Sequence, residues 1–254
     1  MDAGERWRTI GAYALAIVLC LIILTVVMDL WEADLSVPFD YSGDALQAGM
    51  AVKGVIENGW YLHNDFLGAP AGQDLYDFPM GDTLDFLIIR LIALFTRDYA
   101  VAMNAFYLLT FPLTTLAAMF AFRRLKLSSA ASIVGSLLFT FLPYHFFRGE
   151  AHLFLASYFI VPLVALVCIW LFTERVFFKT AGDGKGRLSP GAPLALAALG
   201  ICILASLTMA YYVFFSCFFL LVAGTAASII KRDRSPLLAS VILIALMVIF
   251  FAAT

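Results

Sequence analysis

Long apolar runs recur along the whole chain, separated by short polar segments. A membrane-spanning helix needs roughly 17 to 25 residues, and runs near this length occupy residues 10–30, 99–122, 128–144, 153–172 and 236–254. Residues 192–230 form a longer run with room for two helices, which we divide at the cluster 208–212. The pattern predicts an all-α, polytopic transmembrane helical bundle of about seven spans.

One apolar segment, residues 84–98, is interrupted by Asp85, Arg90 and Arg97 and is short for a span. We expect an amphipathic helix that lies in the membrane interface with its charges turned to water. If the N-terminus is cytoplasmic, most of the 16 Lys and Arg residues then fall on the cytoplasmic side, as the positive-inside rule requires. If the segment crossed the membrane instead, the basic clusters would lie outside.

The composition agrees with a multi-pass membrane protein. It is 63% hydrophobic and 13% charged, with a mean hydropathy of +0.95, whereas about a quarter of residues are charged in soluble domains. The net charge of -2 offers no basic field for nucleic acid, which we exclude as a partner. The four cysteines lie inside apolar runs and are expected to be packing residues. The first run is too long for a signal-peptide core, so we expect it to be a retained span.

This topology leaves a long outer loop, residues 29–98, followed by the remaining spans, residues 99–254, in a single transmembrane module, 1–254. Within the loop, the apolar positions of residues 44–58 have helical spacing and Gly59 supplies a stop, which predicts a second interfacial helix. Residues 65–82 carry Gly and Pro at turn-like spacing. The chain ends within an apolar run, and we expect it to be the N-terminal part of a longer protein.

Carboxylates are concentrated in this loop. Asp44 begins the expected helix, where its side chain would cap the first backbone N–H groups. Held at the membrane edge, the same carboxylate could serve as a general base, and the two roles are compatible. Asp40 is the nearest alternative base. The remaining loop acids, each expected to be solvated, include Asp65, Asp74, Asp77 and Asp82.

A second polar cluster occupies the short outer loop near residue 150. His145, Arg148 and His152 are spaced to share one face of a continuous helix, from which Glu150 points away. The cluster is either an interface anchor or a phosphate site in which Arg148 supplies bidentate donors. Zinc-ligand spacing is absent, which disfavours a metal site. Further outer residues that a substrate could contact are Tyr211, Tyr212 and His63, the two tyrosines being equally suited to an aromatic belt.

The whole arrangement resembles the GT-C superfamily of polytopic membrane glycosyltransferases, which use polyprenyl-phosphate-linked sugars. It shares an N-terminal span, a long acidic first outer loop with two interfacial helices, and alternating spans. Residues 43–59, which begin with GD and end with ENG, and the following LGAPAGQDLYDFP are similar to the first outer loop of bacterial members. The segment LPYHFFRGEAHLFLASYFIVPL is similar to their second outer loop and next span. The resemblance covers most of the chain and rests on loose motifs.

The resemblance implies an enzyme that transfers a sugar from a polyprenyl-phosphate donor to a hydroxyl of a glycan, lipid or protein. The reaction would take place at the outer face of the inner (cytoplasmic) membrane. The acidic residue that serves such enzymes as catalytic base or metal-linked carboxylate maps onto Asp44 and, after it, onto Asp40. A tight Asp-x-Asp pair is missing, so the metal is unknown and a divalent cation, Mg²⁺ or Mn²⁺, stays open as a cofactor.

Two other functions compete with this one. A lipid or solute transporter or flippase would need polar residues deep within its spans, and no expected span carries a charge near its middle. A non-catalytic membrane subunit would use the outer loop only to dock a partner.

Overall fold

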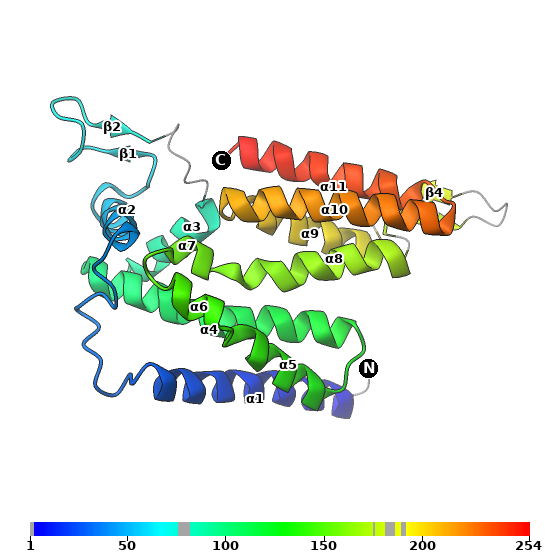
Figure 1. The fold of residues 1–254 in the computed structure, drawn as a ribbon, viewed down its shortest axis with the longest axis horizontal. Coiled ribbons are helices and arrows are strands. Elements are labelled where there is room, and N and C mark those ends of the chain that lie inside the picture. Colours follow the sequence, from blue (N-terminus) through cyan, green and yellow to red (C-terminus); the bar gives the residue numbers. More distant parts are fainter. Residues whose placement is uncertain (1–2, 76–81, 175, 181–185, 189–191) are drawn as a thin grey trace. The chain divides into compact units, whose positions relative to one another are not determined.

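The computed structural model describes residues 3–75, 82–174, 176–180, 186–188 and 192–254. The described chain is helical apart from two short hairpins. It forms two compact units, Met1–Phe159 and Ile160–Thr254 (Figure 1).

The first unit is built on three helices that lie side by side, α1 (Ala3–Val27), α4 (Tyr99–Arg124) and α5 (Ser129–Thr140) (Figure 1). Between α1 and α4 the chain forms α2 (Asp44–Asn58), a hairpin of β1 (His63–Asn64) and β2 (Gln73–Asp74), and α3 (Thr83–Ile92). The strands are antiparallel, with His63 opposite Asp74. Both α2 and α3 pack against α4 and against each other. The unit ends with α6 (Pro143–Arg148), α7 (Leu153–Ala156) and the start of η1 (Tyr158–Ile160).

The second unit contains α8 (Val161–Thr173), α9 (Pro193–Ser206), α10 (Ala210–Lys231) and α11 (Ser235–Ala252). The short strands β3 (Phe178–Thr180) and β4 (Gly186–Leu188) pair antiparallel between α8 and α9. Helix α10 packs against α8 and α11. A Cβ added at Gly224 of α10 would lie 3.0 Å from the backbone oxygen of Pro236, so α10 and α11 approach closely there.

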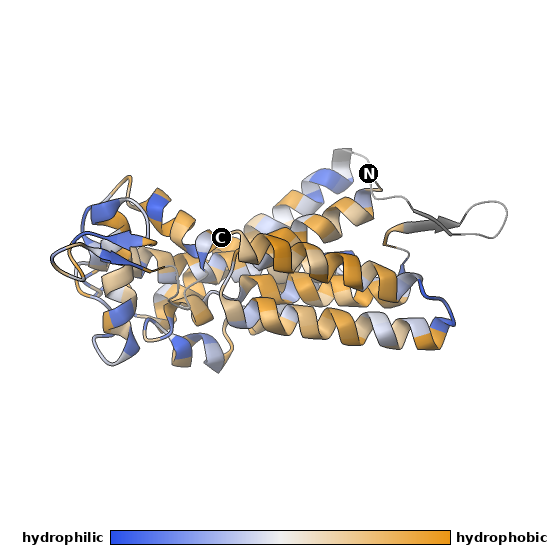
Figure 2. Ribbon diagram, turned by 90° about the horizontal axis from the view of Figure 1, so that it is seen from above, coloured by the Kyte–Doolittle hydropathy of each residue, from blue (hydrophilic) through white to orange (hydrophobic). Residues whose placement is uncertain are grey.

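Six helical stretches among the described residues are long and apolar enough to cross a membrane, when α5 is taken with α6 and α7 with α8. A further apolar helix, α9, has only 14 residues. Large apolar side chains are exposed along these helices, for example Phe214 and Phe218 on α10, as expected for surfaces that face lipid. In Figure 2 the helices are predominantly hydrophobic, whereas the part that carries α2, β1 and β2 has more hydrophilic residues. The protein is therefore a multi-pass membrane protein.

Local signals explain most helix ends. Asp98 caps α4 by accepting hydrogen bonds from the N–H groups of Ala100 and Val101, and Ser128 caps α5. The predicted stop of α2 is confirmed, because Gly59 adopts φ +91° and its N–H donates to the Val55 carbonyl. The predicted division of the run 192–230 is also observed, between Ser206 and Ala210.

The predictions for two of the shorter helical segments are wrong. The helix expected to run continuously through His145 and His152 ends at Gly149, which has φ +48° and starts a turn. Helix α3 is not among the helices long enough to span, but its charges do not all face water, since Asp85 is fully buried. The buried face of α3, which also includes Phe86 and Ile89, packs against its neighbours instead.

Candidate functional site

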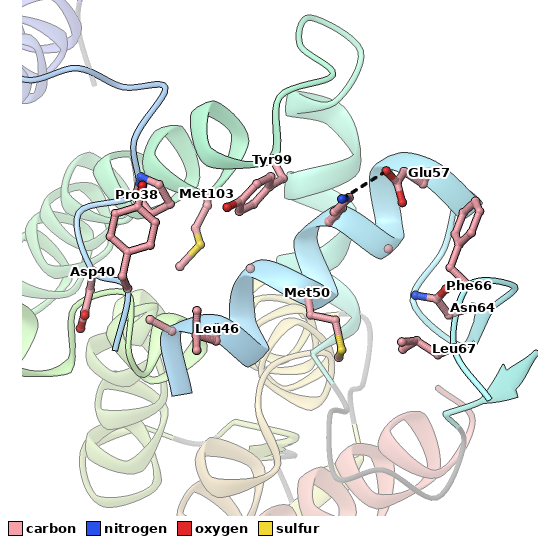
Figure 3. A pocket seen from close by; sticks show the side chains of 15 residues that line it. Pro38, Asp40, Leu46, Met50, Glu57, Asn64, Phe66, Leu67, Tyr99 and Met103 are labelled. Carbon is pink, nitrogen blue, oxygen red and sulfur yellow. Dashed lines mark hydrogen bonds and ion pairs between the residues drawn. The ribbon is translucent and has the colours of Figure 1, made fainter. Parts of the chain in front are cut away.

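A cavity of about 560 Å³ lies along α2 in the first unit. Figure 3 shows Asp40 and Pro38 at the N-terminal end of this helix, with Asn64, Phe66 and Leu67 near its other end. A single elongated space therefore connects a carboxylate to an apolar wall. Its lining residues are Pro38, Asp40, Tyr41, Ala45, Leu46, Gly49, Met50, Lys53, Gly54, Glu57, Asn64, Phe66, Leu67, Tyr99 and Met103.

Helix α2 contributes one face to this cavity. Leu46, Met50, Lys53 and Glu57 recur every three or four residues and so lie in a row. At 1.5 Å per residue the row is about 16 Å long. Lys53 and Glu57 form an ion pair at 3.8 Å, so both signs of charge are present at one point of an otherwise apolar row (Figure 3).

Small residues bring α2 close to α4. A Cβ at Gly49 would lie 3.4 Å from the Tyr99 ring and 3.8 Å from the Met103 sulfur, which is ordinary contact distance. A larger side chain at this position would push the helices apart. Gly49 thus lies where α2 and α4 are in contact, and it lines the cavity as well.

Asp40 is the acidic residue that lies at the N-terminal end of the cavity. Its Oδ1 accepts hydrogen bonds from the N–H and the hydroxyl of Ser42, both at 2.8 Å. These bonds lower the pKa of the Asp40 carboxyl below its ordinary value. Asp40 is consequently an ionised carboxylate at neutral pH.

Two buried side chains hold the backbone that carries Asp40. Asn104 of α4 donates to the carbonyls of Leu35 and Val37, at 2.9 and 2.8 Å, and accepts from the N–H of Phe39. Glu150 accepts from the N–H of Asp40 at 3.0 Å. The segment 35–40 is thus fixed at several backbone groups, in line with the rule that buried polar groups find partners.

Glu150 is almost completely buried, which the sequence did not predict. Burial raises the pKa of its carboxyl to about 7, while the N–H groups of Asp40 and Phe39 act in the opposite direction. Its second oxygen, Oε1, is buried without a hydrogen-bond partner. In this structure Glu150 is thus a support for the Asp40 segment and lines no part of the cavity.

Asp44 does not act as the expected N-cap. Gly43 occupies that position, and Asp44 is the first residue of the helix itself. Its Oδ2 lies 3.7 Å from Nε2 of His152, and the side chain is 70% exposed. Asp44 is not among the residues that line the cavity, although Ala45 beside it is.

The second predicted cluster is not assembled as one face. His145 is buried, stacks on Phe111 with 3.7 Å between ring centroids, and bonds to Thr110 and to the carbonyl of Thr140. Arg148 is half-buried, with its guanidinium 5.2 Å from the ring centroid of Tyr144. Helix α6 ends before Gly149, and beyond this residue Nε2 of His152 lies 3.7 Å from Oδ2 of Asp44.

The remaining candidates are not among the residues that line the cavity. His63 bonds through its two ring nitrogens to Asp74 at 2.7 Å and Asp65 at 3.0 Å, and these hydrogen bonds raise the pKa of its imidazole. Tyr211 and Tyr212 belong to α10 in the second unit. Asp77 lies outside the described residues.

Asp82 and Asp85 are the largest departure from the expected solvated loop, because both are fully buried. A buried carboxylate is unusual unless it is paired. Within the described ranges, no group of three or more His, Cys, Asp or Glu side chains is placed to hold a metal ion.

Neither family models nor curated proteins nor solved structures match this chain.

Proposed function

We propose that the protein is an integral membrane glycosyltransferase of GT-C type, which transfers a sugar from a polyprenyl-phosphate donor to an acceptor hydroxyl. The cavity along α2 is the observation that carries this proposal. Its volume of about 560 Å³ is typical of small-molecule sites. The ionised Asp40 at one end and the apolar row along α2 suit an amphiphilic ligand, as a lipid-linked sugar is.

Asp40 is the proposed general base, ahead of Asp44. The acceptor oxygen would attack the anomeric carbon of the donor and form the new glycosidic bond while its proton passes to Asp40. The bond between the anomeric carbon and the phosphate oxygen breaks, and its electron pair leaves with the lipid phosphate. Because the phosphate leaves readily, this reaction needs no second carboxylic acid, unlike glycoside hydrolysis. Asp44, which lies beside His152, is the alternative base.

The phosphate of the donor needs a cationic contact. Lys53 lines the cavity directly, and its partner Glu57 is a half-exposed neighbour whose attraction is screened by water. Arg148 is the candidate favoured by the sequence, since a guanidinium can bind a phosphate through two parallel hydrogen bonds. We assign the contact with the donor phosphate to Lys53. Arg148 is the proposed contact for another part of the donor molecule.

The proposed location follows from the distribution of charge. In a multi-pass protein whose N-terminus is cytoplasmic, the cavity would open to the periplasmic or extracellular side of the inner membrane. Membrane lipids and a glycan, lipid or protein acceptor are the proposed partners.

The test compares matched carboxylate variants of the purified protein in lipid nanodiscs. Transfer is measured with a panel of polyprenyl-phosphate hexoses, and binding with a sugar-free polyprenyl phosphate. Asp40→Asn should lower the transfer rate by about 100-fold or more, as loss of a general base does, with lipid-phosphate binding retained. Lys53→Ala should instead weaken binding.

Asp34→Asn is the matched control, because Asp34 makes the same turn with Ser36 that Asp40 makes with Ser42 but lies outside the cavity. Its transfer rate should stay close to that of the wild type. Full activity of Asp40→Asn together with loss of activity in Asp44→Asn would move the base to Asp44. Movement of the lipid across the bilayer without sugar transfer would replace the transferase by a flippase.

A further inference from the structure

Asp82 and Asp85 form a buried pair of carboxyl groups at the start of α3. Asp82 is the N-cap residue and Asp85 lies three positions later, so their side chains belong to the same first turn. Neither residue is exposed to solvent. The proposed transfer chemistry does not use them, and neither lines the cavity along α2.

Most of the oxygen atoms in this pair lack a hydrogen-bond partner. Oδ1 of Asp85 accepts a bond from the Ser157 hydroxyl at 2.9 Å. Oδ2 of Asp85 and both oxygens of Asp82 are buried and have no hydrogen-bond partner among the described residues. Two ionised carboxylates in such a place would be strongly unfavourable, because burial removes water and the like charges repel.

Basic side chains do not compensate the pair. In the part of the chain that the structure describes, the ion pairs involve other acids, namely Glu57, Asp65, Asp74 and Asp44. Arg90 in the last turn of α3 donates to the carbonyl of Val55, and Arg97 beyond the helix donates to that of Ile56, both near the end of α2. The sequence of residues 76–81, YDFPMG, contains no Lys, Arg or His.

The neighbouring groups are neutral or aromatic. Tyr61 stacks on Phe86 with 4.2 Å between ring centroids, and its hydroxyl bonds to that of Thr83 at 2.9 Å. Phe86 also contacts Phe154 of α7, with 4.9 Å between centroids. The positive end of the α3 dipole favours negative charge at Asp82 and Asp85, but it is a partial charge that cannot neutralise two carboxylates.

We propose that Asp82 and Asp85 form a proton-binding site that retains at least one proton at neutral pH. While protonated, this site holds α3 against residues 153–157, which comprise α7 and Ser157. A proton on one carboxyl removes its negative charge and turns one of its oxygens from an acceptor into a donor. The bond from Ser157 to Asp85 and the contact between Phe86 and Phe154 then join α3 to the residues that follow Gly149.

The sign of the pH dependence follows from burial. Desolvation raises the pKa of both carboxyls, and the charge of Asp82 raises the pKa of Asp85 further. Groups whose pKa is raised on folding stabilise the fold at pH values below their unfolded pKa, and this contribution is lost as the pH rises through the folded pKa. The attachment of α3 should therefore weaken progressively as the pH rises above the ordinary Asp pKa of 3.8 and through the raised pKa values of the two carboxyls.

Infrared difference spectroscopy of the full chain in nanodiscs tests the protonation directly. The wild type should show a protonated carboxyl stretch at pH 7 that diminishes by pH 10. In a Glu150→Gln background, which removes the protonated carboxyl of Glu150, the double variant Asp82→Asn, Asp85→Asn should lose this signal, whereas Asp34→Asn, which alters an exposed carboxylate, should keep it. The Glu150→Gln variant, recorded alongside, removes the contribution of the other buried acid.

Hydrogen exchange tests the attachment. Protection of the α3 amides, corrected for intrinsic exchange and compared with α5, should fall by about tenfold or more between pH 6 and 9 in the wild type, since one unit of pKa shift corresponds to tenfold. It should be independent of pH when the double variant is combined with Glu150→Gln. Absence of the infrared carboxyl signal at pH 7 would overturn the proposal, because both carboxylates would then be ionised. A signal that disappears on addition of Mg²⁺ or Ca²⁺ and returns with chelator would also overturn it, in favour of two ionised carboxylates with a metal ion between them. The titration of the Glu150→Gln variant, which keeps Asp82 and Asp85, decides this even if the double variant does not fold.

Discussion

Glu150 illustrates how a single buried side chain can organise the candidate site. It lies 110 residues from Asp40 in the chain, yet its carboxylate accepts the Asp40 N–H. Asn104 acts on the same segment from α4. Neither residue contacts the cavity, so we regard them as positioning residues that set where the Asp40 carboxylate lies.

The raised pKa of Glu150 gives a prediction for stability. Since it stands at about 7, above the ordinary value of 4.5, the contribution of the protonated side chain is present below pH 4.5 and lost as the pH rises through 7. The melting temperature of the wild type should therefore fall between pH 5 and 8, and Glu150→Gln should reduce this fall. Thermal unfolding in detergent measures both.

Replacing Glu150 by Gln or by Ala distinguishes the effect of its charge on the Asp40 segment from the effect of its hydrogen bond. Gln keeps an oxygen that accepts the Asp40 N–H, whereas Glu150→Ala removes it. The amides of residues 39–42 should consequently exchange faster in Glu150→Ala than in Glu150→Gln. Equal exchange in the two variants would show that the bond to Asp40 does not fix this segment.

At the scale of single elements, α10 and α11 depend on a glycine. A Cβ at Gly224 would lie 2.5 Å from the Cβ of Ser240 and still closer to its hydroxyl oxygen, so one of the helices would have to move. Gly224→Ala should destabilise the second unit by about 1 to 3 kcal/mol, as overpacking does. Gly200→Ala, on α9 where nothing lies within 4 Å, should not destabilise it.

The free energies of unfolding of Gly224→Ala and Gly200→Ala are compared in mixed detergent. Ser240→Gly combined with Gly224→Ala should recover part of the loss, because the nearest obstructing atoms are gone. Equal stability of the two alanine variants would mean that α10 and α11 do not pack at Gly224 as described.

Helices were the elements best predicted from the sequence. The ends of α2, α4 and α10 follow from local chemistry, namely a glycine, a capping aspartate and a break in the apolar run. The turn at Gly149 was missed, because a glycine inside a short amphipathic segment is compatible with either a helix or a break.

At the scale of the whole molecule, the proposed orientation in the membrane is testable. Single cysteines at Glu32 and Leu127, in a background without the four native cysteines, should differ in their reaction with a maleimide that does not cross membranes. Glu32→Cys should react in intact cells and Leu127→Cys only after lysis, because the positive-inside rule places residues 123–126 in the cytoplasm. The reverse pattern would invert the topology and place the cavity on the cytoplasmic side.

The sequence by itself determined that this is a helical, multi-pass membrane protein, since a continuous apolar run satisfies its backbone only as a helix within lipid. It also drew attention to Asp40 and Asp44, because acids are conspicuous after an apolar span. Only the tertiary structure decided that Asp40 and not Asp44 lines the cavity, that His145 is a core residue, and that Asp82, Asp85 and Glu150 are buried. Those outcomes depend on contacts between residues far apart in the chain. The spacing of residues along the sequence does not show which polar side chains such contacts bury.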